Sequence, residues 1–247
     1  MTKRTIAGLF AGLLMLTQPL TAAAEVEWLV APYIFYSDVS LDLSTGASGG
    51  VSASDLLDKS DTAGMIRIEA AGSRWGVTFD SVWLGLSKST SRPWPGEIGR
   101  VGLNTDLDIS INELGAFYRL STSESGVDLL FGGRNINTDA TLIVIPNMGP
   151  SQRFDASETH TDAFLGARLL QRFGNKWDMT LRGDYSFGDT EGSLNLLGTV
   201  GYRFNDTFAM NLGYRHFAVE LEDTDDGESV TTDITLSGPI LGFLFRF

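Results

Sequence analysis

The sequence lacks cysteine and is poor in lysine. With no Cys among 247 residues, a disulfide framework, a thiol nucleophile and a lipid-modified N-terminal cysteine are all excluded. After residue 24 the only lysines are Lys59, Lys88 and Lys176, and every other basic residue there is arginine. Arginine predominates where charges pair away from water, because its planar fork holds a carboxylate through two hydrogen bonds.

Basic residues are scarce relative to acidic ones. The chain has 18 Lys and Arg against 31 Asp and Glu, which gives a formal net charge of −13. Contacts to phosphates need a basic face, and the sequence shows none, so nucleic acid is not an expected partner. No segment after residue 24 reaches ~18 consecutive apolar residues, which excludes a helix that spans a membrane.

The first 24 residues have the pattern of a secretory signal peptide. A charged start, "MTKR", precedes the apolar run "IAGLFAGLLML" and a tail that ends in Ala22, Ala23 and Ala24. The run is too short to span a bilayer, and the small residues fit cleavage after Ala24. We therefore expect an exported protein with one domain, residues 25–247.

The rest of the chain alternates between apolar and polar residues. In "KWDMTLRGDYSFG" the odd positions include Trp177, Leu181 and Tyr185, whereas the even positions include Arg182 and Asp184. The same split recurs in "SLNLLGTVGYRFN" and in "TFAMNLGYR". A period of two residues indicates β-strands with one apolar face and one charged face.

The sequence predicts ten such strands, with eight or twelve as the alternatives. This number of alternating strands indicates an all-β fold, an antiparallel up-and-down transmembrane barrel. Short connectors alternate with mostly longer ones, 44–61, 89–103, 139–157 and 222–230, as in outer-membrane barrels. The expected location is the outer membrane of a Gram-negative envelope. The expected strands are 26–43, 62–71, 75–88, 104–120, 127–138, 158–173, 176–188, 193–205, 207–221 and 231–247.

A soluble periplasmic β-barrel that binds a ligand is the alternative, because its strands alternate too. Two features favour the membrane barrel. The aromatic residues concentrate at strand ends, as interfacial girdles do. On strand after strand, the polar positions hold arginines that lie opposite acidic residues. Strands that face water more commonly carry lysine and threonine at these positions.

The C-terminal segment "GPILGFLFRF" resembles the closing strand of bacterial outer-membrane barrels. Phe243, Phe245 and Phe247 share one parity, and the last of them is the C-terminal residue. The resemblance implies that these phenylalanines are the signal read by the barrel-assembly machinery. Pro239 lies on the same parity and cannot donate to the ladder, so we expect a bulge or a bend near it.

Three segments, "EWLVAPYIFY" (27–36), "SASDLLDKSD" (52–61) and "RIEAAGSRWGVTFDSVWLGLS" (67–87), resemble the opening of a group of exported barrel proteins without assigned function. The resemblance covers about the first third of the mature chain. It implies a fold and a location, and it transfers no site residues.

The interior of a ten-stranded barrel is little wider than that of an eight-stranded one, which side chains just fill. The inward parity also brings Phe164 and Leu197 into this space. Opposite charges packed so closely should pair and occlude the lumen. The charges expected to line the lumen are Arg67, Glu69, Asp80, Asp128, Arg134, Asp162, Arg168, Asp178, Arg182, Asp184, Arg203 and Arg215.

A second class of function is an omptin-like or lipid-modifying outer-membrane hydrolase. The candidate catalytic residues are Asp106 and Asp108 in "NTDLDIS" and His160 and Asp162 in "SETHTDAF". Two acids on one wall and a His with an acid on the other could activate water. The order His-x-Asp is reversed relative to the omptin pattern. The sequence therefore favours the interpretation that these four residues are polar side chains at the bases of loops, without a catalytic role.

The sequence thus predicts a surface or structural barrel, or a narrow passage for small solutes, through a largely occluded lumen. Catalysis is not expected, and no cofactor or metal is expected. We expect a monomer that contacts outer-membrane lipid and lipopolysaccharide, periplasmic chaperones and the assembly machinery.

Overall fold

The regular structure of the chain is β-strand throughout the part that the computed structural model describes. That part comprises residues 26–43, 48–51, 60–93, 100–121, 125–146, 149–225 and 228–247. The predicted signal peptide, 1–24, lies outside it. Over the same residues no helix is long and apolar enough to cross a membrane. The strands are β1 (Glu27–Phe35), β2 (Asp38–Leu43), β3 (Ser48–Val51), β4 (Ser60–Ala71), β5 (Trp75–Pro93), β6 (Arg100–Arg119), β7 (Gly126–Ile145), β8 (Gln152–Phe173), β9 (Trp177–Gly188), β10 (Gly192–Arg203), β11 (Phe208–Asp225) and β12 (Glu228–Arg246).

The sheet closes on itself because β1 pairs antiparallel with both β4 and β12. Leu29 lies opposite Arg246 and Phe35 lies opposite Ile240, which joins the first strand to the last. β1 and β4 to β12 therefore form a closed ring of ten antiparallel strands, each paired with its neighbours in the chain. The predicted fold class and strand number are confirmed. Closure leaves the ring without a free edge.

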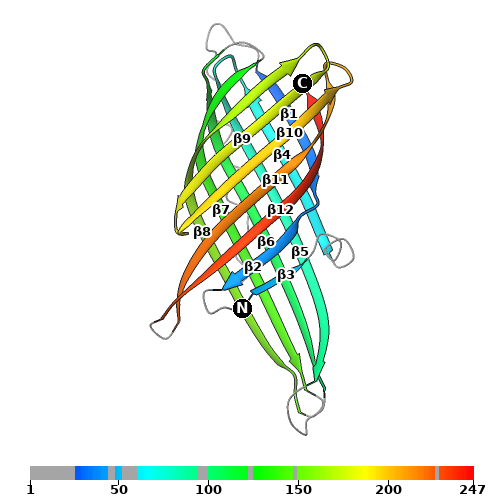
Figure 1. Cartoon of the computed structure of the whole chain (residues 1–247), viewed down its shortest axis with the longest axis vertical. Coiled ribbons are helices and arrows are strands. Elements are labelled where there is room, and N and C mark those ends of the chain that lie inside the picture. The colour runs from blue at the N-terminus through cyan, green and yellow to red at the C-terminus, as the bar shows by residue number, and fades with distance from the viewer. Residues whose placement is uncertain are drawn as a thin grey trace, which may run out of the picture.

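The two ends of the barrel differ in length (Figure 1). One end, here called the turn end, holds Glu27, the C-terminal Phe247 and the short connections after β4, β6, β8 and β10. At the far end β5 to β8 extend well beyond the other strands. Pairing of β7 with β8 continues to Val144 opposite Gln152, whereas β9 begins to pair with β8 only at Asp162.

Much of the sequence expected to form long loops is strand instead. β5 continues to Pro93 and β6 begins at Arg100, so most of 89–103 is paired. Likewise β7 and β8 take up most of 139–157, and β11 and β12 most of 222–230. The apolar alternation of a lipid-facing strand is lost in these segments, and this loss predicts loops. An antiparallel ladder can nevertheless satisfy the backbone hydrogen bonds of such polar segments in water.

The expected irregularity near Pro239 lies in the neighbouring strand. β12 keeps its register with β11 through Pro239, which lies opposite Tyr214. The stretch expected as one strand, 26–43, is interrupted at Tyr36 and Ser37, where Tyr36 N–H still donates to the Pro239 carbonyl at 2.9 Å. Because Pro239 has no N–H to donate in return, the ladder is interrupted there.

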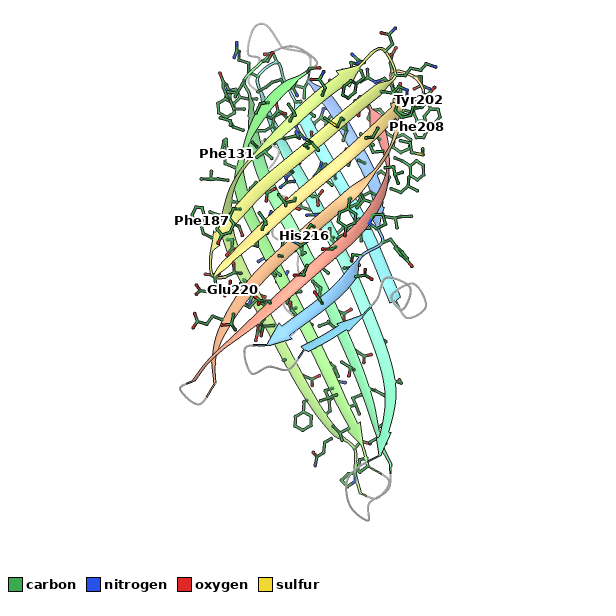
Figure 2. All side chains as sticks on the ribbon, viewed as in Figure 1. Phe131, Phe187, Tyr202, Phe208, His216 and Glu220 are labelled. Carbon is green, nitrogen blue, oxygen red and sulfur yellow. The ribbon has the colours of Figure 1, made fainter. Side chains whose placement is uncertain are left out.

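The outer wall is apolar and carries aromatic residues toward both ends. Leu165, Leu181 and Leu212 are exposed between these ends, as the alternation predicted. Figure 2 places Tyr202 and Phe208 near the turn end and Phe187 toward the far end of the same wall. Ring contacts connect the turn-end aromatics from strand to strand: Trp177, Tyr202, Phe204, Phe208, Phe243 and Phe245.

The parity of the apolar residues reverses toward the far end. On β6, Leu114 faces outward and is 67% exposed, but Ile111 and Ile109 face inward and are buried. On the outer wall next to them, Ser81 donates to Asn112 and Asn137 donates to Ser110. A hydrogen-bonded polar outer wall needs water or headgroups rather than hydrocarbon. The reversal therefore marks where the lipid-compatible wall ends.

Candidate functional site

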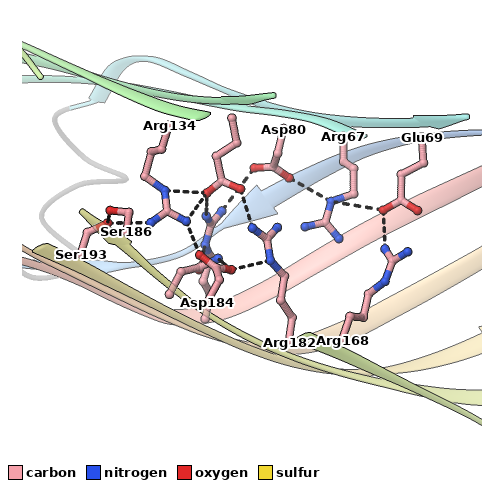
Figure 3. A network of polar contacts seen from close by, with 12 residues as sticks. Arg67, Glu69, Asp80, Arg134, Arg168, Arg182, Asp184, Ser186 and Ser193 are labelled. Atoms are coloured by element: carbon pink, nitrogen blue, oxygen red, sulfur yellow. Dashed lines mark hydrogen bonds and ion pairs between the residues drawn. The ribbon is translucent and has the colours of Figure 1, made fainter. Parts of the chain in front are cut away.

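The middle of the lumen holds a cross-barrel cluster of ion pairs around Glu113. Figure 3 shows Arg134, Arg182 and Asp184 of this cluster. Arg134 Nη2 donates to Glu113 Oε1 at 2.9 Å and also donates to Asp184. Arg182 donates to Glu113 Oε2 at 2.7 Å and to Asp184 Oδ2 at 2.6 Å. Three strands, β6, β7 and β9, place these groups, because their inward positions face one another across a narrow ring.

Arg215 extends the cluster to the opposite wall. Its Nε donates to Asn195 at 3.0 Å, and its Nη1 lies 3.5 Å from Asp80 Oδ1. Tyr33 donates to the same Asp80 oxygen at 2.8 Å. Arg134, Arg182 and Arg215 are matched by Glu113, Asp184 and Asp80, so the formal charges cancel. These six residues are hereafter called the ion-pair belt.

A second cluster lies between the belt and the turn end. Arg168 donates to Glu69 at 2.6 Å and to Asp128 Oδ2 at 2.9 Å, and Asp128 is completely buried. The Arg168 guanidinium also stacks over the Phe117 ring, 4.8 Å from its centroid. Arg67 bridges the two clusters through Asp80 at 3.1 Å. Charge pairing thus continues along much of the lumen.

The lumen on the far side of the belt is filled by apolar side chains. Phe217, Ile136 and Val82 are among the most buried of them, each at most 2% exposed. Arg134 lies over the Phe217 ring at 5.1 Å, which joins the belt to this layer. The apolar layer comprises Phe35, Val39, Met65, Val82, Leu84, Ile109, Ile111, Ile136, Phe217, Val219, Leu221, Ile234, Leu236 and Ile240.

The turn end contains a cavity of about 410 Å³, here called the turn-end chamber. It is lined at its inner limit by Asp80, Tyr33 and Arg215, whereas Glu113, Arg134 and Asp184 do not line it. The chamber therefore stops at the belt. Arg203 and Asp178, both expected in the lumen, lie on the chamber wall.

The other predicted lumen charges occupy the interior. Arg67 and Glu69 are partly buried, and Asp162 is buried beside the β9–β10 turn, where Ser186 and Thr190 donate to its Oδ2 at 2.6 Å. The remaining predicted charges that the structure places inside, all at most 6% exposed, are Asp80, Asp128, Arg134, Arg168, Arg182, Asp184 and Arg215.

The four catalytic candidates do not form one site. Asp106 and Asp108 are exposed and share the outward parity of β6, opposite to that of Ile109. His160 lies 3.4 Å from Glu158 on β8, and Asp162 is held inside by hydroxyl donors. An acid pair on one surface cannot activate a water next to a His on the other, so the expected omptin-like arrangement is absent from these strands.

Sequence reasoning missed Glu113, the centre of the belt. In "ISINELGAF" Glu113 shares its parity with Ile109 and Ile111, which face the lumen. The alternation rule predicts that the apolar parity of each strand faces the lipid. This rule fails on the part of β6 where the apolar residues face the lumen. The sequence did offer one signal: Glu113 lies on the same parity as two isoleucines, and a charged residue on that parity indicates that it faces the lumen.

His216 lies in unbroken strand pairing, although it interrupts the apolar alternation of "YRHFAV". β11 keeps a continuous register with β10 and β12 through His216, which lies between Leu196 and Ser237. Its Nδ1 is 2.6 Å from Ser237 Oγ on the outer wall. Among the described residues, no group of three or more His, Asp or Glu side chains is arranged to hold a metal ion.

Comparisons with known proteins place the chain in no family. No family model and no curated protein matches the chain. Ail, the attachment invasion locus protein of Yersinia pestis, is 11% identical with a TM-score of 0.37, over 91% of this chain and all of that one. The translocator domain of the autotransporter NalP from Neisseria meningitidis is 12% identical with a TM-score of 0.43, over 93% and 90% of the two chains. Neisserial surface protein A is 14% identical with a TM-score of 0.34, over 90% and 99%.

The fold itself, a closed up-and-down ring of ten antiparallel strands, is the one that the sequence predicted.

Proposed function

We propose that this chain is a monomeric outer-membrane barrel with a sealed lumen, whose role is structural or at the cell surface and not general solute passage. The observation that carries the proposal is the end of the turn-end chamber at Asp80, Tyr33 and Arg215. Asp80 and Arg215 belong to the ion-pair belt; the rest of the belt and then the apolar layer lie beyond them. A solute that entered from the turn end would have to displace both.

The outer wall supports location in the outer membrane. Its exposed leucines and its turn-end aromatics match what a lipid-facing barrel requires. Phe243 and Phe245 face outward on β12, and Phe247, directly after the strand, is exposed, which is compatible with recognition by the assembly machinery. Periplasmic chaperones before assembly and lipopolysaccharide afterwards are the partners that such a wall would meet.

The extended part of β5 to β8 supports a role at the surface. It carries exposed polar side chains, among them Arg153 and Asp155, whose ion pair measures 2.8 Å. With the turn end toward the periplasm, this four-stranded wall would project from the cell. The separation of Asp106 and Asp108 from His160 and Asp162 weighs against the hydrolase alternative, and the apolar outer wall weighs against a soluble barrel.

Planar-bilayer conductance of the purified barrel tests the sealed lumen. We expect no steady conductance from the wild type, and we expect channel openings from Arg134→Ala, which removes the side chain shared by Glu113, Asp184 and Ser193. Arg153→Ala, on the exposed part of β8, is the matched control and should stay silent. Ohmic conductance of the wild-type barrel would contradict the proposal.

A further inference from the structure

The turn-end chamber exists because several inward positions carry little or no side chain. Ala31, Ala71 and Gly242 line it, each on a different strand. A side chain of ordinary size at these positions would fill the space that the belt and the second cluster leave open. At about 410 Å³ the chamber is within the size range of small-molecule sites.

Arginine exceeds acid on the chamber wall, although the whole chain is acidic. Seven arginines and five acids line it, whereas the chain has a net charge of −13. The acids deepest in the chamber are already matched, since Glu69 accepts from Arg168 and Asp80 accepts from Tyr33 and Arg67. Arg67, Arg119, Arg168 and Arg215 are likewise engaged by acids, which leaves three arginines nearer the turn end: Arg172, Arg203 and Arg246. They share that part of the wall with Glu27, Asp178 and Asp206.

Two arginines there have donors that nothing in the described chain accepts. Arg203 lines the chamber from β10 and makes no side-chain hydrogen bond or ion pair with a described residue. Arg246, on β12, reaches Glu27 through Nε at 3.7 Å and lies near enough to Asp178 for an electrostatic interaction. Its buried Nη1 finds no hydrogen-bond partner among the described residues. A buried donor without an acceptor is costly and is normally satisfied by some group.

Apolar side chains face the same space. Leu29, Leu170, Leu197, Ile240 and Leu244 contribute to its wall. An inorganic anion would cover none of this apolar surface, which would remain in contact with water. A ligand that matches both the arginine donors and the apolar side chains of the chamber combines one anionic group with an apolar body.

We propose that the turn-end chamber binds a small organic carboxylate, with the carboxylate on Arg203 and Arg246 and the alkyl body against Leu170, Leu244 and Ile240. Two guanidinium groups suit a carboxylate because each presents N–H donors in a planar fork. The site does not depend on whether the lumen is sealed, because it lies wholly on the turn-end side of the belt.

Methyl NMR of the barrel in phospholipid nanodiscs tests the proposal, with hexanoate as the probe. Three isoleucines serve as reporters. Ile240 belongs to the apolar layer and also lines the chamber, whereas Ile136 belongs to the same layer and does not line the chamber. Ile34 lies on the outer wall, where it is 59% exposed. We expect hexanoate to shift the Ile240 signal saturably and to leave Ile136 unchanged. Hexan-1-ol and hexylammonium, which have the same body without the anion, should produce no saturable shift of Ile240.

Two variants separate binding from folding. Arg203→Gln should weaken hexanoate binding about tenfold, the effect of one lost charge-assisted contact. Gly242→Leu should abolish the Ile240 shift by filling the chamber, because a Cβ at Gly242 would meet no atom closer than 3.4 Å. Gly183→Leu, on the outer wall, is the matched control for the second variant and should bind as the wild type does.

A wild-type Kd weaker than about 1 mM would overturn the proposal. So would equal responses to hexanoate and hexan-1-ol, or a hexanoate shift that Gly242→Leu retains. If Ile34 alone responds, the probe partitions into lipid and the chamber is not its site. Conductance of the wild-type barrel would contradict the sealed lumen and leave this site unaffected, so the two proposals fail separately.

Discussion

Arg134 and Glu113 lie directly opposite each other in the register of β6 and β7, with Nη2 2.9 Å from Oε1, and neither side chain is more than 2% exposed. Glu113 also accepts hydrogen bonds from Arg182 and Arg215. One carboxylate thus connects three arginines on three other strands. Removal of either partner leaves a buried charge without compensation.

Arg134→Ala or Glu113→Ala should each lower the free energy of unfolding by ~3–5 kcal/mol, the usual cost of breaking a buried pair. Urea unfolding of the barrel in micelles, or the temperature of its gel-mobility change, measures the effect. Arg153→Ala removes an ion pair whose two side chains are 62% and 57% exposed, so it should cost ~0–1 kcal/mol. Equal effects of the buried and the exposed variants would contradict the burial of the belt.

Adjacent leucines on β10 should respond differently to the same substitution. Leu196 is 45% exposed on the outer wall, and Leu197 packs against the apolar layer and lines the chamber. Leu196→Arg places a charge against lipid and should cost ~2–4 kcal/mol near the midplane. Leu197→Arg should instead disturb lumen packing, with a change in conductance. Identical folding and conductance of the two variants would argue against the assigned parity.

Gly132→Ala should destabilise the barrel by ~1–3 kcal/mol, since it overpacks a tight contact. A Cβ at Gly132 would lie 2.3 Å from the Leu114 carbonyl oxygen and 2.5 Å from the Gly115 Cα, both backbone atoms. Gly183→Ala is the control, because its nearest atom would be a leucine methyl at 3.4 Å. Denaturant midpoints of the two variants should differ, and a Gly132→Ala midpoint equal to that of the wild type would count against the close approach of β6 and β7.

The orientation can be tested with introduced cysteines, because the native chain has none. Ser157→Cys lies on the extended, exposed part of β8, and Asn175→Cys lies in the turn between β8 and β9. On intact cells a membrane-impermeant maleimide should label the first variant and spare the second. Both should react after lysis. Labelling of Asn175→Cys alone on intact cells would reverse the proposed orientation.

Glu191, in the β9–β10 turn, should titrate above its ordinary range. The protonated Glu191 carboxyl donates a hydrogen bond to Glu222, and this bond together with the negative charges of Glu222 and Glu220 raises the pKa of Glu191. The raised pKa means that the ionised form is disfavoured in the folded protein, so repulsion at the turn is relieved as the pH falls through it. Carboxyl ¹³C NMR measures this pKa. Glu222→Gln should lower it, and an unchanged value would exclude the pair as the cause.

The alternation of side chains was sufficient to predict the class of fold and the face of most charged residues. Leu181 and Arg182 occupy opposite walls as their parity requires, because a strand has a period of two. The same rule failed at Glu113, since the apolar parity of β6 turns inward once the strand leaves the lipid-compatible zone. It also failed at 89–103 and 139–157, where polarity indicated loops and the chain forms paired strands.

The sequence by itself determined the strands, their two faces and the lipid-compatible wall, because these depend on residues close together in the chain. Only the tertiary structure decided which charges meet. Arg134 reaches Asp184, and Arg215 reaches Asp80, across 50 and 135 positions of sequence. Those contacts depend on closure of the ring and on the register of every strand between them, since a shift by one residue would turn each inward charge to the outer wall.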